Sequence, residues 1–417
     1  MRIERLTLHD VGPFEDLDIS FPECPDPTKA EVHMFIGPNG SGKSTLLYAL
    51  AHFFGAQLLP ARFRGREAYA CLWHNGARSS TAAENLGRVF TDRGGSASEP
   101  LERTRRAISS RSSSYLPVSF AAFAYAGGRT LASYELKTIQ EPADNPLTNA
   151  VSFHHTTDSQ ALVQWVANTK TKEALARVRG DADLAQRRAR AIEHVEAAIR
   201  RMFGQEIRFV LQDDPLAVKI LQNGVEISLD VLPDGLKSIL AWLADLLMRL
   251  DRILWQDKGV ELLARPFVLF LDEIEIHLHP AWQRKILPAV QELFPNAQIF
   301  LSTHSPFVVG SVSDAWVYPL RLVDGRARCD ERLPSKAGES YSTILSEVFG
   351  VEQEFDVETE GLFQRFHELK RQRLAGDDGV QGDLDALAQQ LRTRSVETRD
   401  IVEHEMRQLA RVLGTAA

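Results

Sequence analysis

Cysteine is scarce in this sequence of 417 residues. The three cysteines, Cys24, Cys71 and Cys329, are scattered, and they form neither a CxxC pair nor a His/Cys cluster at zinc spacing. These absences argue against a disulfide framework and a structural zinc site, and they indicate a reduced, intracellular protein.

Long apolar runs are also lacking. No stretch of about 18 apolar residues occurs, which excludes a transmembrane helix of ordinary length. The first residues, from Met1 to Arg5, include charged side chains, so this end lacks the apolar segment of a signal peptide. We expect a cytoplasmic protein that has no membrane partner.

An excess of positive charge is missing as well. The net charge is -8, with 48 Lys and Arg against 56 Asp and Glu. This balance argues against a protein that coats DNA with its whole surface, although a local basic patch remains possible. Hydrophobic residues make up 44% and charged residues 25%, which is ordinary for a globular protein.

The length predicts two or three structural units, or one long domain with insertions. We see no internal repeat. We expect an N-terminal part of the domain over 1–60, an insertion with a strand and a helical arm over 61–206, a C-terminal part of the domain over 207–345, and a helical tail over 346–417.

Hydrophobic periodicity predicts the order of the elements. We expect strands within 2–20, at 33–36 and over 116–125, with a helix over 44–54. Further along the chain, the pattern predicts strands at 207–211, 225–229, 267–271 and 298–302, helices at 235–250 and 280–294, and a charged, mainly helical tail beyond 342.

Two arginine-rich segments interrupt this order. The span 62–111 contains ten Arg, no Lys and five acids, and its pattern dissolves into Gly, Ser and Arg, so we expect an exposed, mobile insertion. The span 159–203 is rich in Ala, Arg and Glu, and its apolar residues have helical spacing, which predicts a short helical arm. A nucleic acid or a partner protein is expected to dock on these segments, although a solvated loop with helix-surface charges is the alternative.

A glycine-rich loop follows the strand at 33–36 and precedes a helix. It matches the pattern G-x-x-x-x-G-K-[ST], whose backbone N–H groups and lysine surround nucleotide phosphates. An alternative is a glycine-rich turn without a ligand. The residues expected to bind ATP here are Gly37, Pro38, Asn39, Gly40, Ser41, Gly42, Lys43, Ser44 and Thr45, with Ser44 also a ligand of Mg²⁺.

Two adjacent carboxylates end the apolar stretch 267–271. Asp272 can hold the Mg²⁺ shell, while Glu273 can polarise the attacking water as a catalytic base. A surface strand end is the alternative interpretation of such a string. A third strand ends at Thr303 and His304, and this histidine can contact the γ-phosphate or the aligned water, whereas a purely structural histidine is the alternative.

These motifs, in this order, resemble the ABC-type ATPases of the SMC, RecF and OLD group, and among them the stand-alone ATPases of bacterial anti-phage systems such as Septu. The resemblance covers 1–55 and about 207–350, on the strings FIGPNGSGKST, LPDGLKSILAWLADLL, FLDEIEIHLHPAWQ, FLSTHSPFVV and YSTILSEVFG. It implies an α/β P-loop NTPase: an ABC-type ATPase head with an inserted short helical arm and a helical C-terminal tail.

The resemblance also implies roles for individual residues. Asp272, Glu273 and His304 match the magnesium-binding acid, the catalytic base and the switch histidine of the family. Asp234 and Gly235 match the signature loop, which in the family reaches the γ-phosphate across a homodimer with ATP between the two heads. An ordinary capped helix is the alternative there.

At one position the sequence departs from the family pattern, and at two others the role of the residues has an alternative interpretation. Pro233 stands where the family usually has Ser, with Ser238 as a substitute donor one turn on. His277 and His279 match a dimer-contacting segment, although two metal ligands are an alternative interpretation. Arg129 lies in a string similar to one in the defence ATPases and is expected to reach phosphate, with a surface arginine as the alternative.

Two functions remain open from the sequence. The chain resembles the sensing and regulatory ATPase of an anti-phage complex, which would control a separate effector such as a nuclease or toxin. The alternative is a RecF-like repair factor that clamps on DNA. We expect an effector protein held by the arm and the tail, with weak DNA contact at most, and no nuclease activity in the chain itself.

Overall fold

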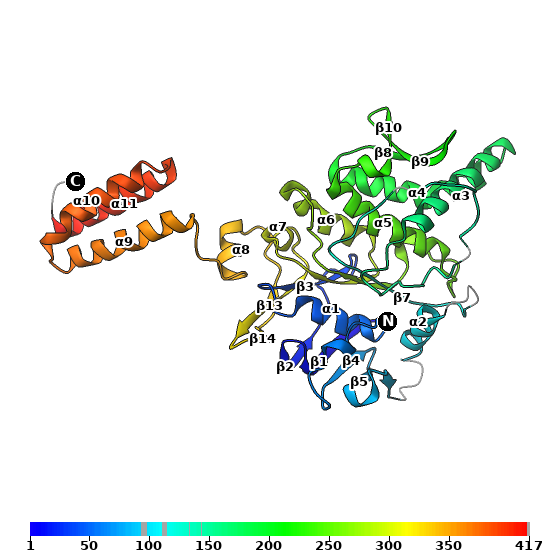
Figure 1. Ribbon diagram of the computed structural model, residues 1–417, viewed down its shortest axis with the longest axis horizontal. Helices are drawn as coiled ribbons and strands as arrows, with labels where there is room; N and C mark the ends of the chain where they lie inside the picture. Colours follow the sequence, from blue (N-terminus) through cyan, green and yellow to red (C-terminus); the bar gives the residue numbers. More distant parts are fainter. Residues whose placement is uncertain (93–97, 111–114, 133, 143, 415–417) are drawn as a thin grey trace. The chain divides into compact units, whose positions relative to one another are not determined.

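The computed structural model describes residues 1–92, 98–110, 115–132, 134–142 and 144–414. The chain divides into two compact units, residues 1–344 and 345–417. The predicted α/β class is confirmed, because the first unit contains parallel β-strands and packed helices (Figure 1). Among the described residues, no helix combines the length and the apolar character that a bilayer crossing needs.

The main sheet of the first unit is largely parallel. β3, β12, β11 and β7 run parallel beside one another, β13 is parallel to β3 on its other side, and β14 and β15 pair antiparallel with β13. Their bounds are β3 Glu31–Ile36, β7 Ala121–Tyr125, β11 Phe267–Leu271, β12 Ala297–Ser302, β13 Trp316–Val323, β14 Arg326–Cys329 and β15 Leu333–Pro334. The inner strands β11 and β12 are buried along their whole length because both faces of the sheet are covered.

A second, antiparallel sheet and α1 (Lys43–His52) lie on one side of the main sheet (Figure 1). Apolar side chains of α1, of β1 and of the main sheet form one core. The strand order of the second sheet is β2-β1-β4-β5-β6, with bounds β1 Ile3–Val11, β2 Phe14–Ser20, β4 Tyr69–His74, β5 Ala77–Ala82 and β6 Phe90–Thr91.

This sheet corrects the expectation of a mobile insertion at 62–111. β4 pairs with β1 over six residue pairs and has a buried face. α2 (Glu99–Ser109) follows it, with Leu101, Thr104 and Ala107 buried. The two strands are short, and the Gly, Ser and Arg residues of the rest of the span dominate its composition, so the sequence pattern did not reveal them. Arg93 and Arg111 lie outside the described residues.

Helices α3 (Ser159–Val178), α4 (Ala182–Phe203), α5 (Asp234–Arg252) and α6 (Pro280–Leu293) lie on the other side of the main sheet (Figure 1). The helical pattern at 159–203 is confirmed, as two helices joined by a short turn. α3 and α4 pack on each other, and both pack on α5, so this hairpin is not a free arm, although the residues around its turn, such as Val178, are exposed.

A small sheet follows the hairpin, with the order β10-β9-β8. The sequence pattern found β8 (Ile207–Asp213) and β10 (Val225–Ile227) but missed β9 (Leu216–Gln222). Short elements complete the first unit: η1 Pro60–Arg62, η2 Ala83–Asn85, η4 Leu229–Val231, η5 Leu262–Ala264 and α7 Pro306–Val309. α8, Tyr341–Glu347, spans the division between the units.

The second unit is helical, as predicted for the tail. It contains α9 Val357–Leu374, η6 Asp378–Val380, α10 Gln381–Arg392 and α11 Val396–Leu413. Apolar side chains of the three α-helices form a separate core, which includes Phe366, Leu391 and Val402. A capping box at Ser395 and Thr398 begins the last helix.

Candidate functional site

The carboxyl ends of four parallel strands lie at one edge of the main sheet. β3 leads into Gly37, β7 into Ala126, β11 into Asp272 and β12 into Thr303. Because these strands are parallel neighbours, the segments that follow them lie next to one another, and ligand sites of open α/β sheets form at such an edge. The topology therefore brings together motifs that are more than 260 residues apart in the sequence.

The loop after β3 has the backbone geometry that its glycines allow. Gly37, Gly40 and Gly42 have φ values of 142°, 82° and 96°. A Cβ on Gly37 would lie 2.3 Å from the carbonyl oxygen of Leu320, and one on Gly42 would lie 2.5 Å from the ring of Phe14. Glycine is therefore required at both positions.

The side chain of Lys43 lies within this loop. Its Nζ donates to the carbonyl oxygens of Gly37 and Pro38, at 2.9 and 3.0 Å. Burial lowers the pKa of Lys43, while the nearby carboxylates of Asp272, Glu273 and Glu275 act in the opposite direction. The lysine and the carboxylates after β11 thus share one electrostatic environment.

Asp272 and Glu273 are held through a serine on the neighbouring strand. The hydroxyl of Ser302 donates to the carboxylate of Asp272 and accepts the backbone N–H of Glu273, the latter at 2.8 Å. Glu273 has a positive φ of 48°, so the chain turns sharply at this residue. A Cβ on Gly127 would lie 2.8 Å from Oε2 of Glu273, which places the segment after β7 against this side chain.

His304 is exposed at the end of β12. Burial of part of the ring, together with the charge of Lys43, lowers its pKa. Its backbone N–H donates to Oε1 of Glu275 at 2.5 Å. No motif assigned a role to Glu275, and the only signal for it was a third carboxylate in the string Asp272-Glu273-Ile274-Glu275.

Arg129 is buried, with 5% of its surface exposed, so the surface-arginine alternative is wrong. Its guanidinium donates to the carbonyl oxygens of Ala126 at 2.9 Å and of Asp272 and Ile274 at 3.4 Å. Burial lowers the pKa of Arg129 to about 10, so the group remains charged at neutral pH. The expected contact between Arg129 and phosphate stays a prediction.

Ser44 and Asp272 suit a magnesium ion chemically, because Mg²⁺ prefers hydroxyl and carboxylate oxygens. Ser44 is in the first turn of α1, directly after Lys43, whose pKa responds to Asp272. Such a site takes its other ligands from phosphate and water, so few protein groups are needed. No cluster of three or more His, Cys, Asp or Glu that could hold a metal occurs in the described part of the chain.

Arg62, like Glu275, belongs to none of the sequence motifs but lies beside the candidate site. Its guanidinium donates to Oγ1 of Thr45 at 2.6 Å and lies over the ring of Tyr48, 4.7 Å from its centroid. η1 and the first turns of α1 are thereby joined beside the P-loop.

The N-terminus of α5 lies close to the segment after β11. A Cβ on Gly235 would lie 2.8 Å from the carbonyl oxygen of His277. Pro233 precedes the helix, and no side chain caps it. Ser238 is 1% exposed, so its hydroxyl does not replace the missing serine at the helix end. In the described chain, no hydrogen bond or ion pair joins Asp234 or Gly235 to the P-loop.

The two histidines after β11 differ in their contacts. Nδ1 of His279 accepts the backbone N–H of Ala281 at 3.2 Å, and this caps α6. His277 is exposed and has a positive φ of 63°. The cap gives His279 a structural role, and the described residues contain no cluster that supports the metal-ligand alternative.

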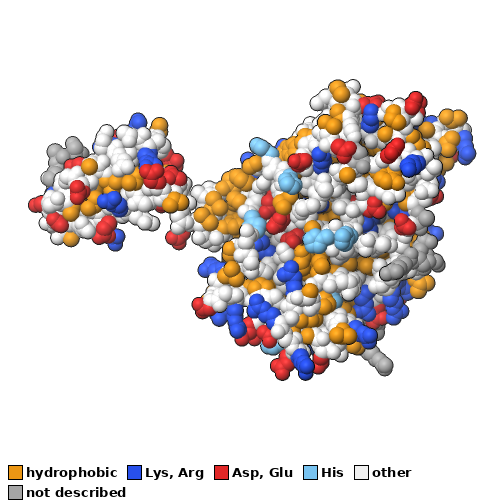
Figure 2. Space-filling model, in the orientation of Figure 1, with side chains coloured by type: hydrophobic (Ala, Val, Ile, Leu, Met, Phe, Trp, Pro, Cys, Tyr) orange, Lys and Arg blue, Asp and Glu red, His pale blue; other side chains and the backbone are white. Residues whose placement is uncertain are grey.

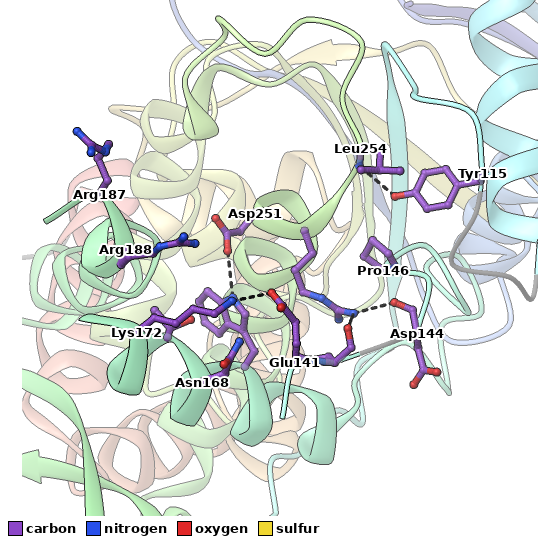
Figure 3. Close-up of a pocket in the computed structure, with 14 residues that line it drawn as sticks. Tyr115, Glu141, Asp144, Pro146, Asn168, Lys172, Arg187, Arg188, Asp251 and Leu254 are labelled. Carbon is purple, nitrogen blue, oxygen red and sulfur yellow. Dashed lines mark hydrogen bonds and ion pairs between the residues drawn. The ribbon is translucent and has the colours of Figure 1, made fainter. Parts of the chain in front are cut away.

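A separate cavity of about 460 Å³ lies between the α3–α4 hairpin, the end of α5 and the loop that precedes α3 (Figure 3). Nζ of Lys172 pairs with Glu141 at 2.7 Å, and the indole N–H of Trp165 donates to Asp251 at 3.1 Å. Figure 3 shows Arg188 on the side of the cavity that faces Asp251. This cavity is lined by both acidic and basic side chains. It contains no residue of the sheet edge that carries the loop 37–43, Asp272, Glu273 and His304, which we call the P-loop edge.

A strand, a glycine-rich loop with a lysine and a helix, together with an acidic strand end on the next strand but one, define a P-loop ATPase. The chain belongs to the family described as "AAA domain, putative AbiEii toxin, Type IV TA system", whose model matches residues 32–310. A second AAA-domain model matches residues 1–61.

Curated relatives match shorter parts of the chain. It is 36% identical over 111 residues to the Retron Ec83 probable ATPase of Escherichia coli, covering 27% of this chain and 20% of that protein. It is 31% identical over 131 residues to the Retron Vc95 probable ATPase of Vibrio cholerae, covering 31% and 25%. It is 26% identical over 152 residues to the Septu protein PtuA of Bacillus thuringiensis, covering 35% and 38%. The matches therefore span less than two fifths of each relative.

Among solved structures, the chain is similar to an SMC head bound to the C-terminal winged-helix domain of ScpA, with 15% identity and a TM-score of 0.48. This similarity covers 80% of the present chain and 98% of that one. The SMC head domain from Thermotoga maritima gives 18% identity and a TM-score of 0.40, and covers 80% and 99%.

Proposed function

We propose that this chain binds Mg-ATP at the P-loop edge and hydrolyses it with Glu273 as the base. The observation that carries this proposal is the convergence of Lys43, Asp272, Glu273 and His304 on one edge of the sheet, beside a loop with P-loop geometry. Family membership supports the same activity.

Each residue of the site has its own role in binding or hydrolysing the nucleotide. The loop N–H groups and Lys43 bind the phosphates, and Ser44 and Asp272 would hold Mg²⁺, which would supply positive charge against the phosphates during transfer. Glu273 accepts the proton of the attacking water. His304, which its lowered pKa keeps neutral near pH 7, can accept or donate a hydrogen bond near the γ-phosphate.

Two variants test the assignment. Glu273→Gln removes the base and leaves the loop intact, so ATP binding is kept while kcat falls by about 10² to 10⁴. Lys43→Ala removes the phosphate charge partner and abolishes binding. Binding of a fluorescent ATP analogue and steady-state phosphate release measure the two effects. Wild-type turnover in Glu273→Gln would show that another group is the base.

We further propose that two heads close on two ATP molecules, each contacted by the N-terminus of α5 of the other head. Free N–H groups at a helix start suit an anion, and α5 lacks a side-chain cap there. Ligand contact from both sides stabilises association. Light scattering of Glu273→Gln with and without Mg-ATP tests this dimer, and a monomer in both conditions, even with the partner protein present, contradicts it.

At the level of the cell, we propose a regulatory ATPase of an anti-phage defence complex that controls a separate effector, such as a nuclease or a toxin. The similarity to retron ATPases and to a Septu protein supports this role. Acidic and basic side chains alternate over the face shown in Figure 2, which favours a protein partner over extensive DNA contact there.

We place the effector contact on the α3–α4 hairpin and on the helices of the second unit. Arg187 and Arg188 of α4 line the cavity, and Arg188 acts through its charge on Glu141 and Asp251 without a hydrogen bond to either in the described chain, so both arginines suit a partner's carboxylates. The double variant Arg187→Glu, Arg188→Glu should lose the effector protein that co-purifies with the wild-type chain, while ATP turnover stays unchanged. Full retention of the effector by this variant would show that the contact lies on another surface.

The alternative function, DNA binding, is tested with purified duplex DNA over a series of salt concentrations, because phosphate contacts weaken steeply with salt.

A further inference from the structure

The carboxylate of Glu275 occupies an unusual position beside the candidate catalytic residues. Oε1 accepts the backbone N–H of His304, and the hydroxyl of Thr303 also favours the charged form of this carboxyl, whereas Oε2 is buried without a hydrogen-bond partner of good geometry in the described chain. A buried carboxylate is costly unless nearby charges or donors stabilise it. Its position therefore calls for a functional explanation.

A buried cation lies on the other side of the same turn. Arg129 reaches from the end of β7 and donates to the carbonyl oxygens of Asp272 and Ile274. Among the carboxylates that act against the effect of burial on the pKa of Arg129, Glu275 contributes most. No hydrogen bond or ion pair joins Arg129 and Glu275 in the described structure, so they act on the turn 272–275 from two sides.

That turn carries strain. Glu273 is a non-glycine residue at φ 48°, a conformation that persists only when the surroundings hold it. Ser302 holds its backbone N–H, Arg129 holds the carbonyl oxygens on either side of it, and Glu275 links the turn to the backbone of His304. One connected set of contacts thus fixes both Glu273 and His304.

We propose that Glu275 and Arg129 are positioning residues, which hold the base Glu273 and the switch residue His304 in one fixed relation for hydrolysis. The proposal rests on the proposed function, in which Glu273 is the base. Arg129 acts through carbonyl oxygens in this role and not through a phosphate. The two roles differ in measurable terms: loss of a phosphate ligand weakens nucleotide binding, whereas loss of positioning lowers kcat.

The experiment compares Glu275→Ala, Glu275→Gln, Arg129→Ala and the double alanine variant, with Glu206→Gln as an exposed control. Circular dichroism checks the fold, a fluorescent ATP analogue gives Kd, and phosphate release gives kcat and KM. We expect Glu275→Ala to lower kcat by about 10- to 100-fold, because misplacing a reacting group by about 1 Å has effects of this size, with Kd changed less than about 3-fold.

The conservative variant separates positioning from simple structural support. Glu275→Gln keeps an acceptor for the His304 N–H, so it should recover most of the kcat that Glu275→Ala loses. The double variant should lose less than the product of the two single effects, because both residues hold the same turn.

Three results overturn the proposal: wild-type kcat in Glu275→Ala, equal losses in Glu275→Ala and Glu275→Gln, or a weakened Kd with unchanged kcat in Arg129→Ala. If Glu275→Ala does not fold, Glu275→Gln and Arg129→Ala decide the question by the same kcat and Kd criteria. Failure of the proposed function looks different, because wild-type turnover in Glu273→Gln rejects the base irrespective of Glu275.

Discussion

The P-loop edge and the cavity beside the α3–α4 hairpin both collect charged side chains, but they hold them differently. At the P-loop edge, backbone groups hold the charges: Lys43 and Arg129 donate to carbonyl oxygens, and Glu275 accepts a backbone N–H. In the cavity, Arg252 also donates to backbone carbonyl oxygens, but other charges pair through side chains alone, as Lys172 does with Glu141, which is 74% exposed. A charged side chain that bonds to backbone atoms is held in one position. The two side chains of an exposed ion pair can instead change their positions when a partner binds.

The largest expected effect comes from a substitution that distorts the backbone of the loop at the P-loop edge. Gly37→Ala places a methyl group 2.3 Å from the carbonyl oxygen of Leu320 at a φ of 142°, so the loop must move. We expect ATP affinity to fall by at least about 10²-fold, since several phosphate contacts depend on this loop. Gly128→Ala is the control, because open space surrounds that position. Equal affinities for the two variants would contradict the prediction.

A smaller change at the same edge tests the base alone. A methyl group on Gly127 would lie 2.8 Å from Oε2 of Glu273 and would displace this carboxylate. Gly127→Ala should therefore lower kcat about 10-fold and leave the Kd of an ATP analogue unchanged. Gly128→Ala, one residue on, should do neither. A kcat for Gly127→Ala that matches the control would show that Glu273 tolerates the shift.

Breaking a pair in the cavity should have little effect on stability. Glu141→Gln removes the partner of Lys172, and exposed ion pairs contribute less than about 1 kcal/mol. We expect the free energy of unfolding, measured in urea, to change by less than this amount, with ATP turnover unaffected. A larger loss would mean that this pair holds the hairpin in place.

The smallest effect concerns pH. Burial raises the pKa of Asp251 above its unfolded value, so its contribution to stability is present at low pH and is lost as pH rises through the folded-state pKa. Asp251→Asn keeps an acceptor for the indole of Trp165 and removes this dependence. The variant should melt at a slightly higher temperature than the wild type at pH 7, and this gain should vanish near pH 3. An identical difference at both pH values would exclude the titration of Asp251.

The comparison also explains what the sequence could predict. The P-loop, the acidic strand end and the segment around His304 are each a short, continuous stretch of the sequence. Such stretches can be recognised from the sequence because the backbone geometry fixes the residue type at each position. Glu275 and Arg129 were harder, since their role depends on contacts between the ends of β7, β11 and β12. β4 and β5 were missed because each has only six residues, and β4 is buried along most of its length, so it shows no period-two pattern.

The α3–α4 hairpin marks the limit of sequence patterns. Its apolar spacing predicted the helices correctly, but the same spacing fits a free arm and a hairpin packed on α5 and α6. Only the tertiary contacts distinguish the two. For the same reason the cavity left no motif, because its lining residues come from five separate segments.

The place of β3 in the main sheet has a consequence for biosynthesis. This strand is made early, yet its neighbours on both sides, β12 and β13, come from residues 297–323. A nascent chain that has emerged only to residue 296 has no strand on either side of β3 and leaves the backbone before the P-loop unpaired. The nucleotide site is therefore assembled near the end of translation of the first unit, and β3 must be kept from other chains until then.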